Sequence, residues 1–142
     1  LARYNVRIKV EAPDIAPPLD ADPGELQQVI LNLIVNGLQS MAAGGRSVVP
    51  VIDVQIAQWN EDMARISVRD RGPGIAKDQA ASLFDPFYTT KPDGMGMGLA
   101  ICRSTIESYG GEIEAFNHPD GGAIFQVTVP IFDRTNDTLN SH

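Results

Sequence analysis

The chain has 142 residues, of which 43% are hydrophobic and 20% charged, and its formal net charge is −7 at pH 7. This length suits one domain with a single core, and the hydrophobic share argues against wholesale disorder. The negative charge, without a cluster of Lys and Arg, argues against a nucleic-acid partner. No run is long enough to span a membrane, so we expect no direct membrane contact. Cys102 is the single cysteine, which excludes an internal disulfide.

Hydrophobic periodicity predicts a series of strands and helices along the chain. In chain order they are a strand over 4–12, a helix over 25–43, strands over about 50–58 and 63–70, a short helix near 77–83, a helix over about 96–109, and strands over 112–116 and 123–129. Because most strands come in adjacent pairs, we expect a mostly antiparallel sheet with helices on one face. In the first strand, Val6, Ile8 and Val10 alternate with charged residues, so we expect that strand to be half-buried.

The long helix has clear end signals and an unusual polar stripe. Asp22 is the expected N-cap, and Pro23 follows at the first helical position. The helix contains no Lys or Arg, and Asn32 and Asn36 place two amide oxygens one turn apart. Such oxygens suit a hard cation such as Mg²⁺. A solvated surface face is the equal alternative. The stripe consists of Glu25, Gln28, Asn32, Asn36 and Gln39.

The stretch DRGPGI (70–75) places an aspartate at the end of a strand. Asp70 has the same parity as Ile66 and Val68, so we expect its carboxylate to point toward the core. A buried carboxylate must accept hydrogen bonds. Backbone N–H groups of an Asx turn could supply them, or the exocyclic amine of adenine could. Gly72 and Gly74 would then let the backbone pass close to a flat ring.

A second glycine run, GMGMGL (94–99), leads directly into a helix. Glycines at this place allow backbone N–H groups to approach an anion at a helix N-terminus. The run matches neither the dinucleotide-binding pattern nor a P-loop. A phosphate site and a plain flexible loop are therefore equal alternatives for this run taken alone.

Taken in order, these motifs resemble the ATP-binding catalytic domain of sensor histidine kinases, within the gyrase, chaperone, histidine kinase and mismatch-repair superfamily. The segment QVILNLIVNGLQSM (28–41) is similar to the N box of that family, and DRGPGI is similar to its G1 box. LFDPFYTTK (83–91) resembles its F box, and GMGMGLAI (94–101) its G2 box. The resemblance covers about residues 3–132. It implies an α+β two-layer sandwich, the Bergerat fold, in which helices cover one face of a mostly antiparallel mixed sheet.

The resemblance also implies ATP and Mg²⁺ as ligands, with a role for each matching residue. Asn32 and Asn36 would face Mg²⁺ and the phosphates, Asn36 being the better candidate for a direct ligand. Asp70 would bind the adenine amine. Lys91 would contact a phosphate, with a solvated loop charge as the equal alternative. The expected catalytic residues are Asn32, Asn36 and Lys91. The expected nucleotide-binding residues are Asn36, Asp70, Gly72, Gly74, Ile75, Phe84, Phe87, Thr90, Lys91, Gly94, Gly96, Met97, Gly98 and Leu99.

The resemblance further implies a mobile lid over ATP, from about residue 76 to 96, anchored by Phe84 and Phe87. We expect the catalytic domain to occupy residues 1–132 and to be cytoplasmic, and we expect a disordered tail over 133–142. The sequence begins without an initiator Met, so we expect it to be a piece of a larger protein.

The sequence departs from the family pattern at several positions. Gly37 stands where alanine is usual, Arg71 stands where asparagine is common, and Met95 and Met97 replace commoner Thr or Ser and Leu. None of these departures removes a residue that the chemistry needs. They leave nucleotide affinity and lid mobility open.

The resemblance implies phosphoryl transfer rather than hydrolysis. The ATP-hydrolysing relatives carry a glutamate where this chain has Asn32, and an amide cannot act as a base. The resemblance implies that the acceptor is a histidine on a separate dimerisation domain. Neither histidine of this chain matches it, since His118 precedes a proline in a turn and His142 is terminal. That domain would pass the phosphate to the receiver domain of a response regulator. The alternatives are an ATPase or Ser/Thr kinase of the same superfamily, and a non-catalytic nucleotide-binding regulatory module.

Overall fold

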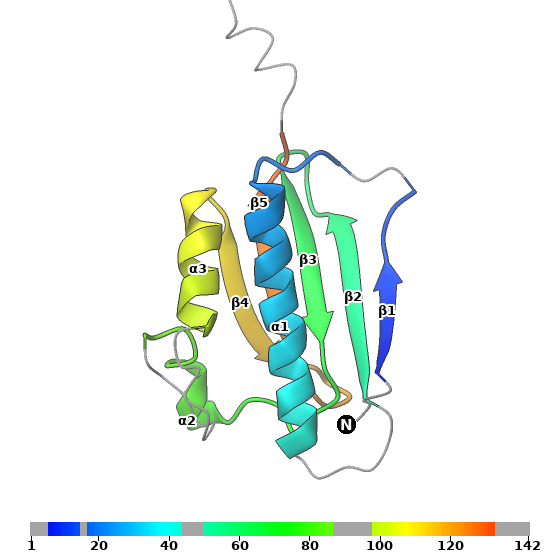
Figure 1. Cartoon of the computed structure of the whole chain (residues 1–142), viewed down its shortest axis with the longest axis vertical. Helices are drawn as coiled ribbons and strands as arrows, with labels where there is room; N and C mark the ends of the chain where they lie inside the picture. The colour runs from blue at the N-terminus through cyan, green and yellow to red at the C-terminus, as the bar shows by residue number, and fades with distance from the viewer. Residues whose placement is uncertain (1–5, 15–16, 44–49, 87–97, 133–142) are drawn as a thin grey trace, which may run out of the picture.

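The computed structural model describes residues 6–14, 17–43, 50–86 and 98–132. The described part forms a sheet with helices packed against it (Figure 1). The strands are β1 (Arg7–Glu11), β2 (Val51–Gln58), β3 (Met63–Arg69), β4 (Glu112–Asn117) and β5 (Ala123–Pro130). The helices are α1 (Pro23–Ala43), α2 (Lys77–Ala80) and α3 (Gly98–Ser108).

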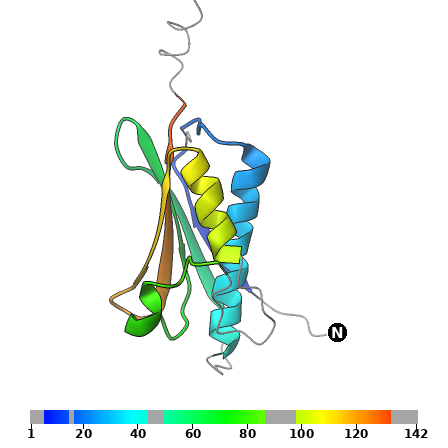
Figure 2. The same ribbon diagram turned by 90° about the vertical axis from the view of Figure 1, so that its left-hand side faces the viewer.

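The sheet has five strands in the order β1-β2-β3-β5-β4. Strand β1 pairs with β2 in parallel, and the other neighbours are antiparallel. Helices α1 and α3 lie side by side on one face of this sheet (Figure 2). The fold is therefore the expected α+β two-layer sandwich with a mostly antiparallel mixed sheet.

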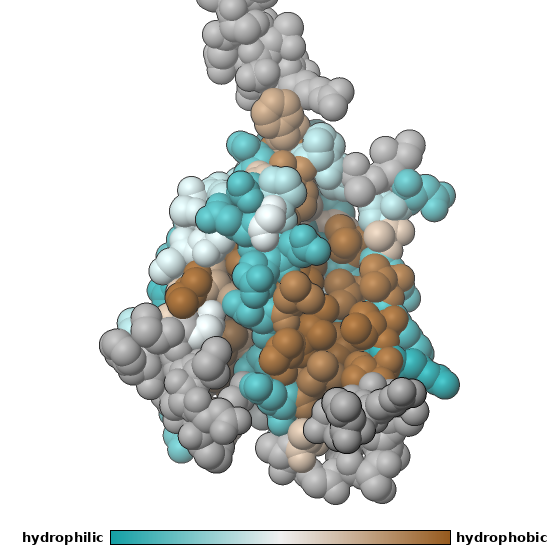
Figure 3. All heavy atoms as spheres, in the orientation of Figure 1, coloured by the Kyte–Doolittle hydropathy of each residue, from teal (hydrophilic) through white to brown (hydrophobic). Residues whose placement is uncertain are grey.

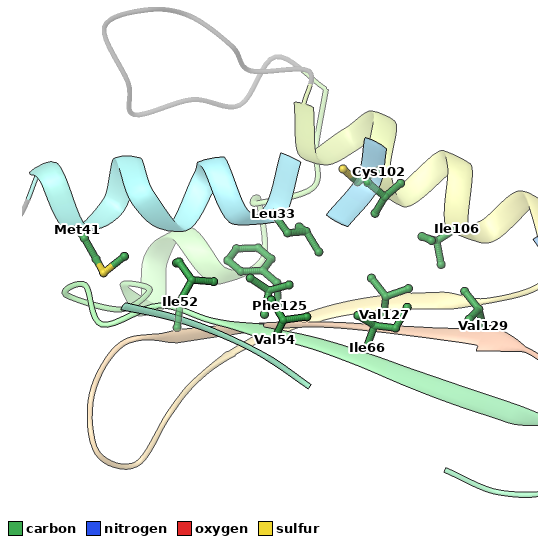
Figure 4. Close-up of a cluster of buried hydrophobic side chains, with 13 residues drawn as sticks. Leu33, Met41, Ile52, Val54, Ile66, Cys102, Ile106, Phe125, Val127 and Val129 are labelled. Atoms are coloured by element: carbon green, nitrogen blue, oxygen red, sulfur yellow. The ribbon is translucent and has the colours of Figure 1, made fainter. Parts of the chain in front are cut away.

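The core lies between the sheet and the two long helices (Figure 4). Alternating residues of the three central strands point to the helical side, which follows from the two-residue period of a strand. Leu33 of α1 and Ile106 of α3 are fully buried above them. Cys102 is also fully buried, and burial raises the pKa of its thiol, so it acts as a small apolar side chain. The strand residues of the core that Figure 4 labels are Ile52, Val54, Ile66, Phe125, Val127 and Val129.

Helix α1 begins and ends where the sequence indicates. The Asp22 carboxylate accepts a hydrogen bond from the backbone N–H of Glu25 at 2.9 Å, and Pro23 is the first helical residue. One side of the helix packs on β2 and β3, and another contacts α3. The polar stripe lies on the side toward α3, where the Asn32 amide nitrogen lies 3.7 Å from the Cys102 sulfur and the hydroxyl of Tyr109, directly after α3, donates to Glu25 at 2.6 Å. Part of the stripe is therefore a helix–helix contact and not a plain solvated face.

Strand β1 corrects one expectation from the sequence. We expected a half-buried strand, but all of its residues are exposed, including Ile8 at 49% and Val10 at 61%. The cause is the position of β1 at the edge of the sheet, one strand outside β2 and β3, which α1 contacts. Alternation predicted the strand correctly, but it does not indicate whether a helix covers the apolar side.

Helix α2 is shorter than the expected helix near 77–83. It has no buried residue, and beyond Ala80 the chain continues in turns, with the Ser82 N–H bonded to the Gln79 carbonyl. Because short helices depend on packing for their stability, an unburied segment does not propagate.

Candidate functional site

The centre of the site is Asp70, directly after the end of β3. Its side chain is only 2% exposed, as the strand parity predicted. Carboxylate atom Oδ1 accepts hydrogen bonds from the backbone N–H of Gly72 at 2.8 Å and of Ala123 at 3.2 Å. Within the described part of the chain, the hydrogen bonds that Asp70 accepts through its carboxylate both end on Oδ1. The Asx turn is thus present, and it leaves Oδ2 for another donor.

Glycines bring α1 and the 70–75 turn into close contact. A Cβ added at Gly72 would lie 2.7 Å from the Ser40 hydroxyl oxygen. A Cβ at Gly37 would lie 2.9 Å from a methyl carbon of Ile52 and 3.1 Å from the Cβ of Asp70. Both positions are therefore closely packed against the aspartate or the helix beside it. The departure from alanine at residue 37 matches this close approach.

The turn between β4 and β5 completes the surroundings of Asp70. Gly122 has φ +85°, and a Cβ there would overlap the backbone carbonyl oxygen of Asp70. The next residue, Ala123, bonds Asp70 through both its N–H and its carbonyl. Sequence reasoning identified this turn only as a hairpin connection. The pair of glycines after Asp120 was the signal that the backbone makes a close approach here.

Asn117 is a second residue that sequence reasoning missed. Its Oδ1 accepts from the Ile75 N–H at 2.7 Å, and its Nδ2 donates to the Ile75 carbonyl at 3.0 Å. Gly74 precedes this clamp with φ +86°, and a Cβ at Gly74 would lie 2.7 Å from the Asn117 oxygen. The last residue of β4 therefore fixes the backbone of the 74–75 turn.

The two asparagines of α1 lie on neighbouring turns, on the side of the helix that faces α3. Asn32 accepts a hydrogen bond at Oδ1 from the Gln28 amide at 3.1 Å, and its Nδ2 points at the Cys102 sulfur at 3.7 Å. Asn36 follows one turn later and is half-buried. At the start of α1, burial and the hydrogen bond to Glu25 raise the pKa of Tyr109 to about 12, so its hydroxyl remains a donor.

Some of the remaining predicted site residues lie in the part of the chain that the structure describes, and the others lie outside it. Phe84 packs edge-on against Phe125, with ring centroids 6.2 Å apart and an interplanar angle of 79°. Leu99 is partly buried against the core. Gly98 begins α3, and a Cβ there would meet no atom within 4 Å. The predicted site residues that lie outside the described part of the chain are Phe87, Thr90, Lys91, Gly94, Gly96 and Met97.

The described residues hold neither a cluster of metal-ligating side chains nor a helix that could cross a membrane. No group of three or more His, Cys, Asp or Glu side chains is placed there to hold a metal ion. None of the helices among these residues combines the length and the apolar character that a membrane crossing needs.

Comparison with known families identifies the chain. The family model described as histidine kinase-, DNA gyrase B- and HSP90-like ATPase matches residues 21–133. The sensor histidine kinase TmoS of Ectopseudomonas mendocina is 39% identical over 126 residues, which are 89% of this chain and 13% of TmoS. The C4-dicarboxylate transport sensor protein DctS of Rhodobacter capsulatus is 45% identical over 115 residues, 81% of this chain and 17% of DctS. The chain thus spans less than a fifth of the length of these two relatives.

Solved structures give the same result. The catalytic domain of histidine kinase ThkA, in a nucleotide-free form, matches with a TM-score of 0.77 and 30% identity over 89% of this chain and 80% of that one. Full-length ShkA in complex with AMPPNP matches with a TM-score of 0.74 and 30% identity over 89% of this chain and 26% of ShkA. The chain therefore belongs to the histidine kinase-, DNA gyrase B- and HSP90-like ATPase family, as a catalytic ATPase domain of the kind that sensor histidine kinases use in two-component signalling.

Proposed function

We propose that this domain binds Mg²⁺–ATP with the adenine amine at Asp70, and transfers the γ-phosphate to a histidine on a separate dimerisation domain. The observation that carries the proposal is that the described donors bond only one of the two oxygens of the Asp70 carboxylate. Two backbone N–H groups hold Oδ1, and within the described part of the chain they are the only donors to this carboxylate. A buried carboxylate oxygen without a protein donor favours a ligand that brings an N–H group.

Adenine fits this requirement better than guanine does. The adenine amine donates to Oδ2, whereas guanine presents a carbonyl oxygen at the corresponding position, so two acceptors would face each other. A Cβ at Gly72 would lie 2.7 Å from the Ser40 hydroxyl oxygen and one at Gly74 2.7 Å from the Asn117 oxygen, so the two glycines hold the turn that would line the adenine pocket close to α1 and β4. The Asn117 clamp keeps the Ile75 backbone fixed while the ring binds.

The amide oxygens of Asn32 and Asn36 fit a magnesium ion, because Mg²⁺ accepts a neutral protein oxygen and retains water and phosphate oxygens as its other ligands. When bound, Mg²⁺ would supply positive charge against the charge that develops on the phosphates during transfer. We assign Asn36 as the direct ligand and Asn32 as its neighbour. Lys91 and the glycines of the G2 box would contact the phosphates.

The proposed reaction needs no base on this domain. The lone pair of the acceptor imidazole nitrogen attacks the γ-phosphorus, and a nitrogen–phosphorus bond forms. The bond from that phosphorus to the β,γ-bridging oxygen breaks, and ADP leaves with the electron pair. Asn32 cannot deprotonate water, which favours this transfer over hydrolysis. The contribution of the domain is to hold the phosphate in line with the nucleophile.

Further parts of the proposal concern the surroundings of the site. The segment from about 76 to 96 is a lid, for which the Phe84–Phe125 contact supplies an anchor on the core. Residues 1–132 are the catalytic domain, which operates in the cytoplasm. The phosphohistidine then passes its phosphate to a response-regulator receiver domain.

The test is a labelling reaction. The domain is mixed with γ-labelled ATP and the purified dimerisation domain of the same kinase. We expect label on the dimerisation domain that is labile to acid and stable to base, which is the signature of phosphohistidine. Release of free phosphate without protein labelling would indicate an ATPase, and acid-stable label would indicate a Ser/Thr kinase. Nucleotide binding without either product would indicate a regulatory module.

A further inference from the structure

Helix α1 carries a glycine in its buried interior, at Gly37. Seen from the helical side of the sheet, the exposed surface of α1 is polar toward α3 and apolar toward β1 (Figure 3). Gly37 belongs to neither of these sides, because it is buried toward the sheet, as are Leu33 and Met41 one turn away in either direction. A glycine inside a helix lowers the stability of that helix relative to alanine. Glycine is therefore favoured at this position only if a side chain does not fit.

Two residues lie against Gly37, and they differ in how easily they could make room for a side chain. A Cβ at Gly37 would lie 2.9 Å from the Cδ1 methyl of Ile52, which lies under α1 (Figure 4). That methyl is the end of a flexible side chain, which can change its rotamer. The same Cβ would lie 3.1 Å from the Cβ of Asp70 and 3.6 Å from its Oδ2. Because the Cβ of Asp70 is bonded to the main chain, it can move only if the main chain moves.

The main chain at Asp70 is held by the turn between β4 and β5. The Asp70 N–H donates to the Ala123 carbonyl at 3.0 Å, and Oδ1 accepts from the N–H groups of Gly72 and Ala123. A Cβ at Gly122 would overlap the Asp70 carbonyl oxygen, so this turn already packs as closely as a backbone allows. A methyl group at residue 37 would therefore displace the Asp70 carboxylate or weaken the hydrogen bonds to Oδ1.

We propose that Gly37 is a positioning residue for the adenine-binding carboxylate. Without a Cβ at residue 37, Asp70 lies close enough to α1 for its Oδ2 to meet the amine of the base. The proposal rests on the nucleotide site proposed above. It gives a physical reason for the glycine that stands here in place of the usual alanine. Since Asn36 directly precedes Gly37, the same contact also fixes the distance between the proposed metal ligand and Asp70.

The test measures how strongly the chain prefers a base that carries the amine. Calorimetry gives the affinities for Mg²⁺–ATP and for the Mg²⁺ complex of purine riboside triphosphate, which lacks the exocyclic amine. We expect the wild type to bind ATP at least about tenfold more tightly. In Gly37→Ala this preference should fall below about threefold, because the carboxylate no longer meets the amine. A merely structural effect would weaken both nucleotides equally and leave their ratio unchanged.

A double variant separates the two contacts of the added methyl group. Ile52→Val removes the Cδ1 atom, so in Gly37→Ala/Ile52→Val only the contact with Asp70 remains. The preference for ATP should stay below about threefold there, and Ile52→Val alone should keep the wild-type ratio. The matched glycine control is Gly24→Ala in the first turn of α1, where the new Cβ would lie 3.3 Å from the Asp22 carboxylate. That control should leave the preference unchanged, and thermal denaturation checks the fold of each variant.

Three results would overturn the proposal while leaving the proposed function intact. Gly37→Ala could keep the wild-type preference for ATP. The double variant could recover that preference, which would make Ile52 and not Asp70 the important neighbour of Gly37. Both variants could fail to fold, which would show that residue 37 serves the fold and not the site. If the wild type itself bound the two nucleotides equally, the assignment of Asp70 would fail, and the proposed function would fail together with this inference.

Discussion

The two ends of the proposed nucleotide site, Asp70 and Asn32, differ in how the protein uses their oxygen atoms. At Asp70, the backbone N–H groups of Gly72 and Ala123 hold Oδ1, and no donor among the described residues engages Oδ2, which we propose for a ligand. At Asn32, the amide oxygen accepts from Gln28 and the amide nitrogen faces Cys102. The comparison teaches that a predicted ligand residue must be judged by which of its atoms the fold has already engaged. Oδ2 of Asp70 can accept one more hydrogen bond without any rearrangement. The Asn32 oxygen would have to give up its hydrogen bond from Gln28 before it could bind a metal ion.

The largest expected effect is on the backbone that surrounds Asp70. In Gly122→Ala, the new Cβ overlaps the Asp70 carbonyl in addition to meeting a φ of +85°. We expect the free energy of unfolding to fall by about 3 kcal/mol, measured by urea denaturation. Gly121→Ala is the matched control, because its φ is +104° and its Cβ would meet no atom within 4 Å. That control should lose only about 1 kcal/mol, and equal losses would refute a close contact at Gly122.

The next largest effect is expected on nucleotide affinity when the charge of the Asp70 carboxylate is removed. Asp70→Asn keeps an acceptor for Gly72 and Ala123 but removes the negative charge that would face the adenine amine. We expect Mg²⁺–ATP affinity to fall by about 10–100-fold, since a hydrogen bond to a charged group contributes about 1.5–3 kcal/mol. Calorimetry measures the affinity, and thermal denaturation checks that the variant is folded. An affinity within threefold of the wild type would contradict the assignment.

A smaller effect is expected at Asn117, which holds the turn beside the proposed ligand and not the ligand itself. Asn117→Ala removes both hydrogen bonds to the Ile75 backbone. We expect nucleotide affinity to fall by about fivefold, because a neutral hydrogen bond contributes about 1 kcal/mol. Asn117→Asp is the conservative control, which keeps the acceptor for the Ile75 N–H and should retain part of the affinity. If Asn117→Ala bound ATP as the wild type does, the clamp would be irrelevant to the site.

The smallest effects are expected at the asparagine end of the proposed nucleotide site. Asn32→Ala should lower Mg²⁺–ATP affinity by about threefold, because the Asn32 oxygen is shared with Gln28. Asn36→Ala, which removes the proposed direct ligand, should lower it by about tenfold. Magnesium titrations at fixed ATP separate the two variants. Gln28→Ala removes the competing donor and should leave magnesium affinity unchanged or raise it. If Gln28→Ala lowered magnesium affinity as much as Asn32→Ala does, the hydrogen bond between Gln28 and Asn32 would have only a structural role.

Much of the fold could be predicted from local patterns in the sequence. The Asp22 cap and the glycines after α3 gave the ends of the long helices to within a few residues. The parity of Ile66, Val68 and Asp70 predicted correctly that the aspartate is buried. These signals are local, since a cap and a strand period depend on residues close in the chain.

The rest depended on contacts between segments distant in sequence. The Ala123 N–H that bonds Asp70 lies 53 residues away, and Asn117 reaches Ile75 across 42 residues. No local pattern indicates such a pairing. The exposure of Ile8 and Val10 also could not be predicted, because alternation is the same whether a helix covers the strand or not. The residues that the resemblance added between 87 and 97 stay predictions.

The most direct test of the account is calorimetry of the wild-type chain with Mg²⁺–ATP and with Mg²⁺–GTP. The free oxygen of Asp70 should favour a base that donates an amine, so we predict that ATP binds at least about tenfold more tightly. In Asp70→Asn, this preference should disappear while the protein stays folded. Equal wild-type affinities for the two nucleotides would contradict the role assigned to Asp70, and the proposed function with it.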